Sequence, residues 1–513
     1  MVSGADKRVE FVAYSAQTVS GRLREVYTEA ELLACVQEAQ AAGWTVTFRG
    51  GGMAFDTHAL NDGMVIQLRG FDEIGDVVDG TITVGANARW DAILEKTCAS
   101  GHLPYVLVST EYATVGGTIS ADSLSRFSPS CGKEGNHVER LRFMKVDGTV
   151  LECSREENSE VFRGAVNGFG LLGAVLSVTY RLMPAPFAKV VVKTDFDRFR
   201  GLRSLATKLV TAVDEHHAEL RRPEGVPASR KALGDVPVGD ARAISAVVYM
   251  NAQRDGFVMR SSYIEGKDLA LEPCPFHRPK SFLHRALQVL ALFDVTRRIG
   301  YWYILNVYLP LGKVKHATDD LFGYSFFQGG NDAVRRAGRS HGFAMGIIQQ
   351  TFVVPRTAGD SAGTAERLAA FLECAETVFE RHRVSPPLID VLYLPNDMQE
   401  GFPLSSSYGV SGYAITVTFE HPFTPRFPKE EAAFAELAEE VAKIGGRVHL
   451  VKNVFAAPAT LEKMYAQGVE TMRGLKRDLD PHWTLRSDFV KRLFPSLAEK
   501  DGAAVRHPGA AGG

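Results

Sequence analysis

The sequence has few cysteines, no excess of charge of either sign and no long apolar run. Its six cysteines are scattered without a C-x-x-C pair or zinc-type histidine spacing, which argues against a disulfide framework and predicts no metal site. The formal net charge is only −2, so no bulk field attracts nucleic acid. The amino terminus lacks an apolar signal segment, and no charge-free apolar run reaches the roughly 18 residues that a membrane span needs. These absences predict a cytoplasmic protein whose partner is a small or lipid-like molecule and not nucleic acid.

What is present is an ordinary globular composition on a long chain. At 513 residues, of which 45% are hydrophobic, the chain exceeds what one core can serve, which predicts two or three substructures. The first part alternates helix and strand periodicities, beginning with a capping box formed by Thr28 and Glu31. The expected elements are a helix at 28–43, strands at 44–48, 64–68 and 81–84, a hairpin turn at 79–80 and a helix at 88–100.

From about Met183 the pattern changes. Residues 221–243 are rich in proline, glycine and charge without periodicity, which predicts an exposed, flexible loop. Beyond this loop, strands and helices are separated in a way that is typical of an α+β layer. The expected elements are strands at 347–354 and 413–419 and helices at 364–381 and 428–444. Residues 501–513 form a tail rich in glycine and alanine that is expected to be disordered.

Two glycine-rich segments are candidates for binding chemistry. Arg49 to Ala54 contains three consecutive glycines after a strand. Because glycine accepts positive φ and has no Cβ, this loop can direct several backbone N–H groups at one phosphate, although a tight turn is an equally good interpretation. Thr114 to Ser120 contains paired glycines within a β-branched strand pattern. Such a pattern is typical of a β-bulge, or of a strand that a flat cofactor ring approaches closely.

A third segment, residues 167–173, has the spacing G-x-G-x-x-G. A dinucleotide fingerprint of the Rossmann type begins a helix. Residues 174–182 instead alternate as a strand does. The glycines therefore introduce a strand, and the pattern does not favour an NAD site.

The three segments, in this order, resemble the FAD-binding domains of the vanillyl-alcohol oxidase type, also called the p-cresol methylhydroxylase (PCMH) type. The resemblance implies an α+β fold with a two-part FAD-binding domain and a substrate domain, the cap, built on an antiparallel sheet. It places the pyrophosphate at the first segment, the isoalloxazine at the second and the adenine end at the third. The residues that it implies for FAD binding are Arg49, Gly50, Gly51, Gly52, Met53, Ala54, Thr114, Gly116, Gly117, Ser120, Gly173 and Val175.

The resemblance also implies the organisation of the whole chain. The FAD-binding domain is expected over 1–183, the cap over 184–445, and a carboxy-terminal return to the FAD domain over 446–500. Within the family, the chain is similar to decaprenylphosphoryl-ribose oxidases over most of its length. It shares the run from Cys153 to Phe162 with delta-24 sterol reductases.

Several departures from the family patterns bear on cofactor and substrate. Relatives that bind FAD covalently have a histidine in the first loop, whereas this sequence has Met53, whose thioether forms no such bond. We therefore expect non-covalent FAD. Residues 124–129 replace a histidine-rich run of the ribose oxidases, Thr416 replaces a cysteine and Thr351 replaces a glutamine. These differences argue against that ribose lipid as the substrate.

Lys452 is the first candidate for the catalytic base. In the resembling enzymes a lysine at this place reaches the flavin and the substrate, and burial would lower its pKa toward the range of a base. Taken alone, a lysine at a strand end is usually exposed. Gln349 and His449 are candidates to orient the substrate, although a histidine more often packs than catalyses. The other histidines considered, His58, His216 and His217, are expected to be solvated.

Residues 280–312 are apolar and aromatic, with basic residues around them. Such a stretch is typical of a peripheral membrane contact or an entrance for a lipid-like substrate, and equally of a buried cap core.

The leading functional hypothesis is an FAD-dependent oxidase or dehydrogenase that transfers a hydride from a substrate alcohol carbon to flavin N5. The first alternative is a flavin-dependent reductase of a carbon–carbon double bond in a sterol or isoprenoid, with NAD(P)H as the donor. The second alternative is a flavin-binding scaffold without catalysis.

Overall fold

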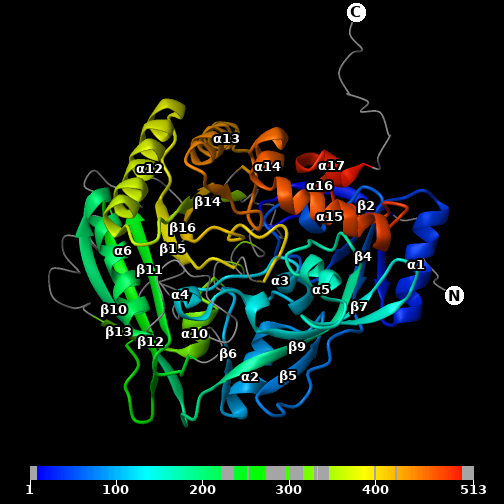
Figure 1. Cartoon of the computed structure of the whole chain (residues 1–513), viewed down its shortest axis with the longest axis horizontal. Helices are drawn as coiled ribbons and strands as arrows, with labels where there is room; N and C mark the ends of the chain where they lie inside the picture. Colours follow the sequence, from blue (N-terminus) through cyan, green and yellow to red (C-terminus); the bar gives the residue numbers. More distant parts are fainter. Residues whose placement is uncertain are drawn as a thin grey trace, which may run out of the picture.

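Three β-sheets organise the part of the chain that the structure describes (Figure 1). The computed structural model describes residues 8–220, 236–250, 254–272, 296, 299, 316–328, 332, 335, 346–397, 400–421 and 424–499. The apolar stretch predicted at 280–312 and the tail at 501–513 lie almost entirely outside these residues. Among the described helices, none combines the length and the apolar character that crossing a membrane requires.

The first sheet has four strands in the order β1-β2-β4-β3. The strands are β1 (Arg8–Val12), β2 (Thr18–Val26), β3 (Val46–Arg49) and β4 (Met64–Leu68). Helix α1 (Glu29–Ala41) connects β2 to β3, and the short helix η1 (Thr57–Ala59) lies between β3 and β4. Half of the predicted capping box is present, because Thr28 Oγ1 accepts the Glu31 N–H at 3.2 Å, whereas Glu31 accepts the N–H of Tyr27 at 2.7 Å and not that of the cap residue Thr28. The pairing of β2 with β4 and of β3 with β4 is parallel, as an α/β unit requires.

The second sheet is antiparallel and contains five strands. They are β5 (Thr81–Gly85), β6 (His102–Pro104), β7 (Val138–Met144), β8 (Val150–Cys153) and β9 (Ala174–Pro184). The helices of this part are α2 (Trp90–Ala99), α3 (Val115–Ile119), α4 (Ser128–Cys131), η2 (Glu134–His137) and α5 (Ser159–Ala165). The turn predicted before β5 is confirmed, since Asp79 and Gly80 both have positive φ, 48° and 71°.

The strand interpretation of the second glycine segment is wrong, because Thr114 caps the short helix α3. Tertiary contacts outweigh the β-branched composition here. The Val115 and Gly116 N–H groups donate to the Ala88 and Ala86 carbonyls at 3.0 and 2.7 Å. Val115 and Ile119, one helical turn apart, are both fully buried.

The third sheet has eight antiparallel strands in the order β13-β10-β12-β11-β15-β16-β14-β17. The strands are β10 (Val190–Arg200), β11 (Arg242–Tyr249), β12 (Asp255–Glu265), β13 (His316–Asp320), β14 (Gly346–Pro355), β15 (Leu388–Leu394), β16 (Gly412–His421) and β17 (Arg447–Val448). The helices of this part are α6 (Leu202–Glu219), α10 (Leu321–Ser325), α12 (Ser361–His382) and α13 (Pro428–Lys443). We refer to this sheet as the cap sheet. Its helices α6, α12 and α13 lie along one side of it in Figure 1, so the predicted α+β cap is confirmed.

Two predictions for the cap need correction. Of the loop predicted at 221–243, residues 221–235 lie outside the described part, but Arg242 and Ala243 belong to β11, and the Arg242 N–H donates to Ser130 Oγ at 2.7 Å. His216 is not solvated, because it lies on the apolar face of α6 and its ring nitrogen contacts Ser130 Oγ at 2.6 Å. His217 is half-buried, with its ring 5.1 Å from that of Tyr393.

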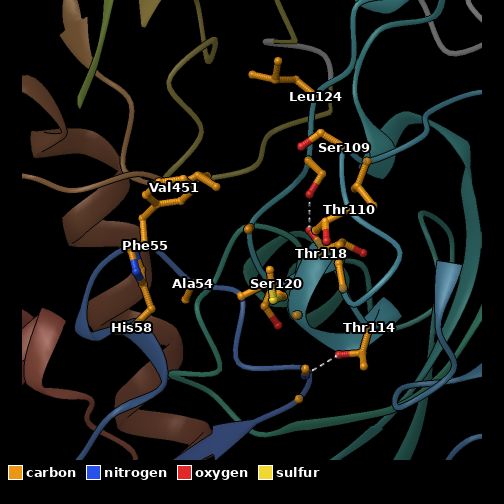
Figure 2. Close-up of a pocket in the computed structure, with 18 of the residues that line it drawn as sticks. Ala54, Phe55, His58, Ser109, Thr110, Thr114, Thr118, Ser120, Leu124 and Val451 are labelled. Carbon is orange, nitrogen blue, oxygen red and sulfur yellow. Dashed lines mark hydrogen bonds between the residues drawn. The ribbon is translucent and has the colours of Figure 1, made fainter. Parts of the chain in front are cut away.

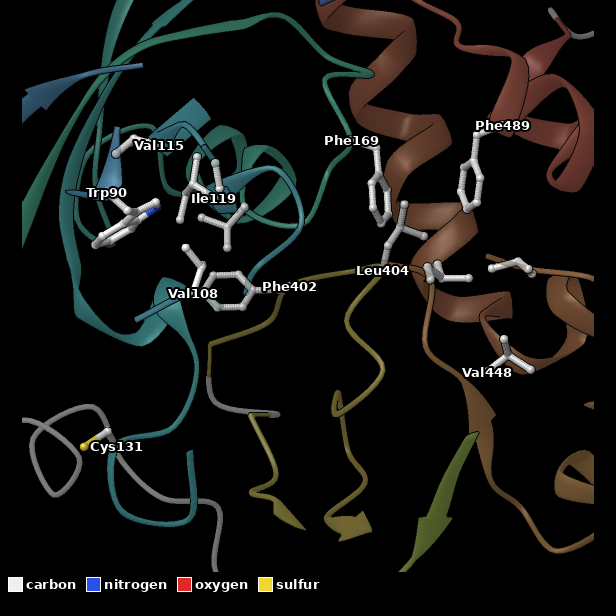
Figure 3. Packing of buried hydrophobic residues seen from close by; sticks show 14 of the residues in the cluster. Trp90, Val108, Val115, Ile119, Cys131, Phe169, Phe402, Leu404, Val448 and Phe489 are labelled. Atoms are coloured by element: carbon white, nitrogen blue, oxygen red, sulfur yellow. The ribbon is translucent and has the colours of Figure 1, made fainter. Parts of the chain in front are cut away.

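The carboxy-terminal helices, together with a connecting loop that pairs with β3 through Leu485, contact the first sheet and the third glycine segment. They are α14 (Pro458–Met464), α15 (Ala466–Leu479), α16 (Asp488–Leu493) and α17 (Pro495–Ala498). Buried Lys476 of α15 donates to the carbonyls of Leu171 and Leu485 at 2.9 and 2.7 Å and pairs with Asp480 at 2.9 Å. Figure 3 shows Phe489 of α16 beside Phe169, with 5.7 Å between the ring centroids.

Candidate FAD and substrate site

A cavity of about 390 Å³ lies between the glycine segments and the cap sheet. Figure 2 shows Ala54, His58 and Val451 on one side of it and Thr110, Thr114 and Thr118 on the other. The structure brings together every residue that the sequence predicted for this site. The cavity is lined by Arg49, Gly50, Gly51, Gly52, Met53, Ala54, Thr114, Gly116, Gly117, Ser120, Gly173, Val175, Gln349, His449 and Lys452.

The first glycine segment is packed so tightly that no side chain fits. A Cβ on Gly50 would lie 2.1 Å from Thr114 Oγ1, and a Cβ on Gly51 would lie 2.0 Å from the Tyr112 carbonyl oxygen. Gly52 has a φ of +70°, which favours glycine. Within the described part of the chain, the N–H groups of Gly52, Met53 and Ala54 donate to no protein acceptor. Such a run of N–H groups can bind an anion.

The second segment presents hydroxyl groups from α3 and its flanks. Thr118 Oγ1 receives the Trp90 indole N–H at 3.0 Å and lies 2.8 Å from Glu134 Oε1. Burial raises the pKa of Glu134 to about 8. The Thr118 hydroxyl is therefore fixed by partners behind the cavity wall, while Ser120 and Thr114 line the cavity beside it.

The third segment introduces β9, as the sequence predicted. Gly173 lets β9 approach β7 closely, because a Cβ there would lie 2.4 Å from Phe143 Cζ and 2.5 Å from the Met144 carbonyl oxygen. Gly170, Gly173 and Val175 line the cavity. The prediction that His58 is solvated is wrong. Its Nε2 lies 2.7 Å from the Leu450 carbonyl oxygen, and its ring stacks on Phe489 at 3.7 Å.

The cap sheet closes the cavity with a polar row. Thr351 of β14 pairs with Thr416 of β16, and their hydroxyls lie 2.8 Å apart. Gln349 lies two residues before Thr351 on the same face of β14, and its Nε2 donates to Thr418 Oγ1 at 2.8 Å. Its Oε1 is buried and has no partner among the described residues. This oxygen is available to accept a hydrogen bond from a bound molecule.

His449 and Lys452 enter the cavity from the segment after β17. Burial lowers the pKa of His449 to about 3, so its imidazole is neutral at physiological pH, and Nδ1 lies 2.8 Å from Ser406 Oγ. Burial also lowers the pKa of Lys452 to about 8, although the carboxylates of Asp390 and Asp332 oppose this shift. Lys452 Nζ lies 4.2 Å from the centroid of the Phe55 ring. At neutral pH a larger fraction of Lys452 is therefore uncharged than of an exposed lysine, and the uncharged amine can accept a proton.

The glycine segment and the Lys452 segment are attached to each other. Asn453 donates from Nδ2 to the Phe55 carbonyl at 3.2 Å, and the Val454 N–H donates to Asp56 Oδ2 at 3.0 Å. Arg492 of α16 donates to both Asp56 carboxylate oxygens at 2.7 Å. Because Asp56 is fully buried, this pair holds Lys452 in register with the first glycine loop.

The lining residues that sequence reasoning did not single out include Arg126, Thr118 and Asp390. Asp390 had a detectable signal, because it is the one charged residue in the apolar strand β15, whose sequence is LIDVLYL. A charge inside a central strand requires a partner or a functional cavity. Thr118 lies within the second glycine segment but was not singled out there, and Arg126 had no comparable local signal.

The lining residues fit FAD. The free N–H groups at Gly52 to Ala54 and the guanidinium of Arg49 suit a pyrophosphate, and the glycines leave no Cβ where a cofactor would approach. The hydroxyl-lined α3 faces the polar row of the cap sheet across one continuous cavity. This arrangement can hold a flavin between the second glycine segment and a substrate bound against the cap.

The fold and the site together define an FAD-binding domain of the PCMH type, and residues 22–154 match the family model described as "FAD binding domain". The predicted fold class and cofactor are confirmed, and the protein is an FAD-dependent oxidoreductase. Over 503 residues it is 24% identical to decaprenylphosphoryl-β-D-ribose oxidase of Mycolicibacterium smegmatis, which covers 95% of this chain and 97% of that relative. Over 190 residues it is 27% identical to cytokinin dehydrogenase 1 of Oryza sativa subsp. japonica, which covers 36% of each chain. A solved chitooligosaccharide oxidase shares the fold with a TM-score of 0.64 and 14% identity, over 93% of this chain and 92% of that one.

Proposed function

We propose that this oxidoreductase oxidises an alcohol carbon of a small-molecule substrate and holds its FAD non-covalently. The observation that carries the proposal is the position of Lys452. It is a lysine with a pKa near neutrality, and it lies in the same cavity as the glycine segments, Gln349 and His449. A flavin oxidation of an alcohol needs a group to take the hydroxyl proton at the place where the C–H bond meets the ring.

Bound FAD supplies the hydride acceptor. Neutral Lys452 takes the proton from the substrate hydroxyl at Nζ, and the resulting ammonium stabilises negative charge that develops nearby. Gln349 accepts a substrate hydrogen bond at its unpartnered Oε1. His449, neutral and fixed by Ser406, orients the substrate without adding charge.

The pH dependence of flavin reduction tests this role of Lys452. A general base acts in its neutral form, and the pKa of Lys452 is lowered to about 8 by burial. We therefore expect the reduction rate constant to rise about tenfold per pH unit at lower pH and to level off above about pH 8. Anaerobic stopped-flow absorbance at several pH values measures this profile. A flat profile through this range would remove Lys452 as the base.

Acid precipitation tests the non-covalent attachment. The first glycine loop has Met53 where a covalent link would need a nucleophilic side chain, so all flavin absorbance should move into the supernatant as FAD. Flavin that stays in the pellet would mean that another side chain forms a covalent bond. Anaerobic reduction by NADPH, with no reduction by any alcohol, would indicate a reductase in place of the proposed oxidation.

A further inference from the structure

An acidic residue occupies the centre of the cap sheet. Asp390 lies in β15, between β11 and β16, where it pairs with Val247 on one side and with Thr416 on the other. Apart from Asp390, every residue of β15 is apolar or aromatic. A carboxylate in such a strand is costly because burial removes its hydration, and burial does raise the pKa of Asp390.

The register places this carboxylate on the cavity side. Asp390 is in line with Thr416 and Thr351, and all three line the cavity. Tyr393 is three positions after Asp390 in β15 and therefore lies on the opposite face, where its ring contacts that of His217 of α6. Strand alternation therefore separates the helix-covered face from a cavity face that carries Asp390.

The carboxylate of Asp390 receives no hydrogen bond from any described residue, and the neighbouring side chains act on it through charge alone. Two cationic groups act on it, Arg126 and Lys452, and both line the same cavity. Lys452 also interacts with Asp332, and the Arg126 guanidinium lies 4.3 Å from the centroid of the Phe327 ring. The charges of Arg126 and Lys452 lower the free-energy cost of burying the Asp390 carboxylate. Both carboxylate oxygens can still accept hydrogen bonds from a bound molecule.

An aromatic wall stands in the same cavity. Phe127 stacks on Tyr263 with centroids 4.2 Å apart, and Tyr324 meets Phe127 edge-on at 6.1 Å. All three line the cavity. Aromatic faces beside a carboxylate and a guanidinium match a molecule that has C–H faces and several hydroxyl groups. A sterol or isoprenoid hydrocarbon would leave Asp390 without a hydrogen-bond donor.

We propose that Asp390 is a specificity-determining residue whose carboxylate accepts hydrogen bonds from hydroxyl groups of the substrate, so that the cavity selects polyhydroxylated alcohols over apolar ones. The inference rests on the proposed function, because it treats this cavity as the substrate site.

Binding of two probes to the FAD-loaded protein tests the proposal. D-Xylose represents polyhydroxylated molecules and geraniol represents isoprenoid alcohols, and each is titrated against the flavin absorption spectrum of the oxidised protein. We expect D-xylose to bind the unchanged protein more tightly than geraniol does. The isosteric variant Asp390→Asn should bind D-xylose about 10- to 100-fold more weakly, because a hydrogen bond to a charged acceptor becomes a neutral one. Asp390→Leu should shift the preference to geraniol.

The control is Asp195→Asn, a change in β10 of the same sheet, where the side chain is 61% exposed. It should leave both titrations unchanged. FAD content and circular dichroism report whether each variant folds, and Asp390→Asn decides the matter if Asp390→Leu does not fold. Tighter binding of geraniol than of D-xylose to the unchanged protein, no D-xylose binding, or identical affinities in Asp390→Asn would each overturn the proposal.

The same samples separate this inference from the proposed function. Loss of D-xylose binding in Asp390→Asn, together with flavin that no alcohol reduces, would reject alcohol oxidation and leave the role of Asp390 intact. Flavin reduction by an alcohol, with D-xylose affinity unaffected by Asp390→Asn, would reject only the role of Asp390.

Discussion

Replacing Lys452 by methionine is expected to slow the reduction of the flavin by two to four orders of magnitude, about the contribution of a positioned general base. Methionine keeps much of the length and the apolar stem of lysine but has no ionisable group. It also removes the cation that lies over the Phe55 ring and near Asp390. FAD should remain bound, because the glycine segments and Arg49 are unchanged.

The measurement is anaerobic stopped-flow absorbance with the alcohol that reduces the unchanged protein fastest. Lys443→Met on α13 is the matched control, since that side chain is 66% exposed and should leave the rate unchanged. An unaltered rate in Lys452→Met would show that another group takes the proton. Loss of FAD from Lys452→Met would instead assign the lysine to cofactor binding.

Local sequence signals were sufficient to predict the structure of segments whose conformation depends on their own residues. The N-cap bond of Thr28, the turn at Asp79 and Gly80 and the amphipathic helix α12 all formed as expected. The glycine segment Arg49 to Ala54 also belongs here, because steric freedom at consecutive glycines is a property of the residues themselves. Such features need no knowledge of distant partners.

Predictions failed where partners distant in sequence determine the environment. His58 is buried by the Leu450 carbonyl, 392 residues away, and by Phe489 of α16. The second glycine segment became a helix because carbonyls of Ala86 and Ala88 accept its first N–H groups. Neither contact leaves a trace in the neighbouring sequence, and propensity alone is too weak to compete with it.

Asp390 is an intermediate case. The single charge in the LIDVLYL strand is visible in the sequence, but its meaning depends on which face of the strand is covered. Only the register with Thr416 and the packing of Tyr393 against α6 show that the carboxylate faces the cavity. A charged residue in an apolar strand is therefore a useful signal of a functional face even before the face is known.

The glycine segment supplies the second large expected effect. Replacing Gly51 by alanine should reduce the affinity for FAD at least about 100-fold, because the new Cβ would lie 2.0 Å from the backbone oxygen of Tyr112. That oxygen belongs to the backbone and cannot rotate away, so the loop must move. The Gly51 N–H also donates to Thr114 Oγ1 at 3.3 Å, which couples the first glycine segment to the start of α3.

Movement of Gly51 therefore disturbs both the loop expected to hold the pyrophosphate and the helix expected to lie against the isoalloxazine. Flavin content after purification and fluorescence titration of the apoprotein with FAD measure the effect. Gly474→Ala on α15 is the matched control, because a Cβ there meets nothing within 4 Å and alanine favours a helix. Full FAD content in Gly51→Ala would mean that the loop tolerates displacement, and the pyrophosphate would then have to be held by Arg49 and the hydroxyls of α3. The peptide N–H groups of Gly52, Met53 and Ala54 donate to no described protein acceptor. We therefore expect the affinity for FAD to fall when a substitution displaces these groups.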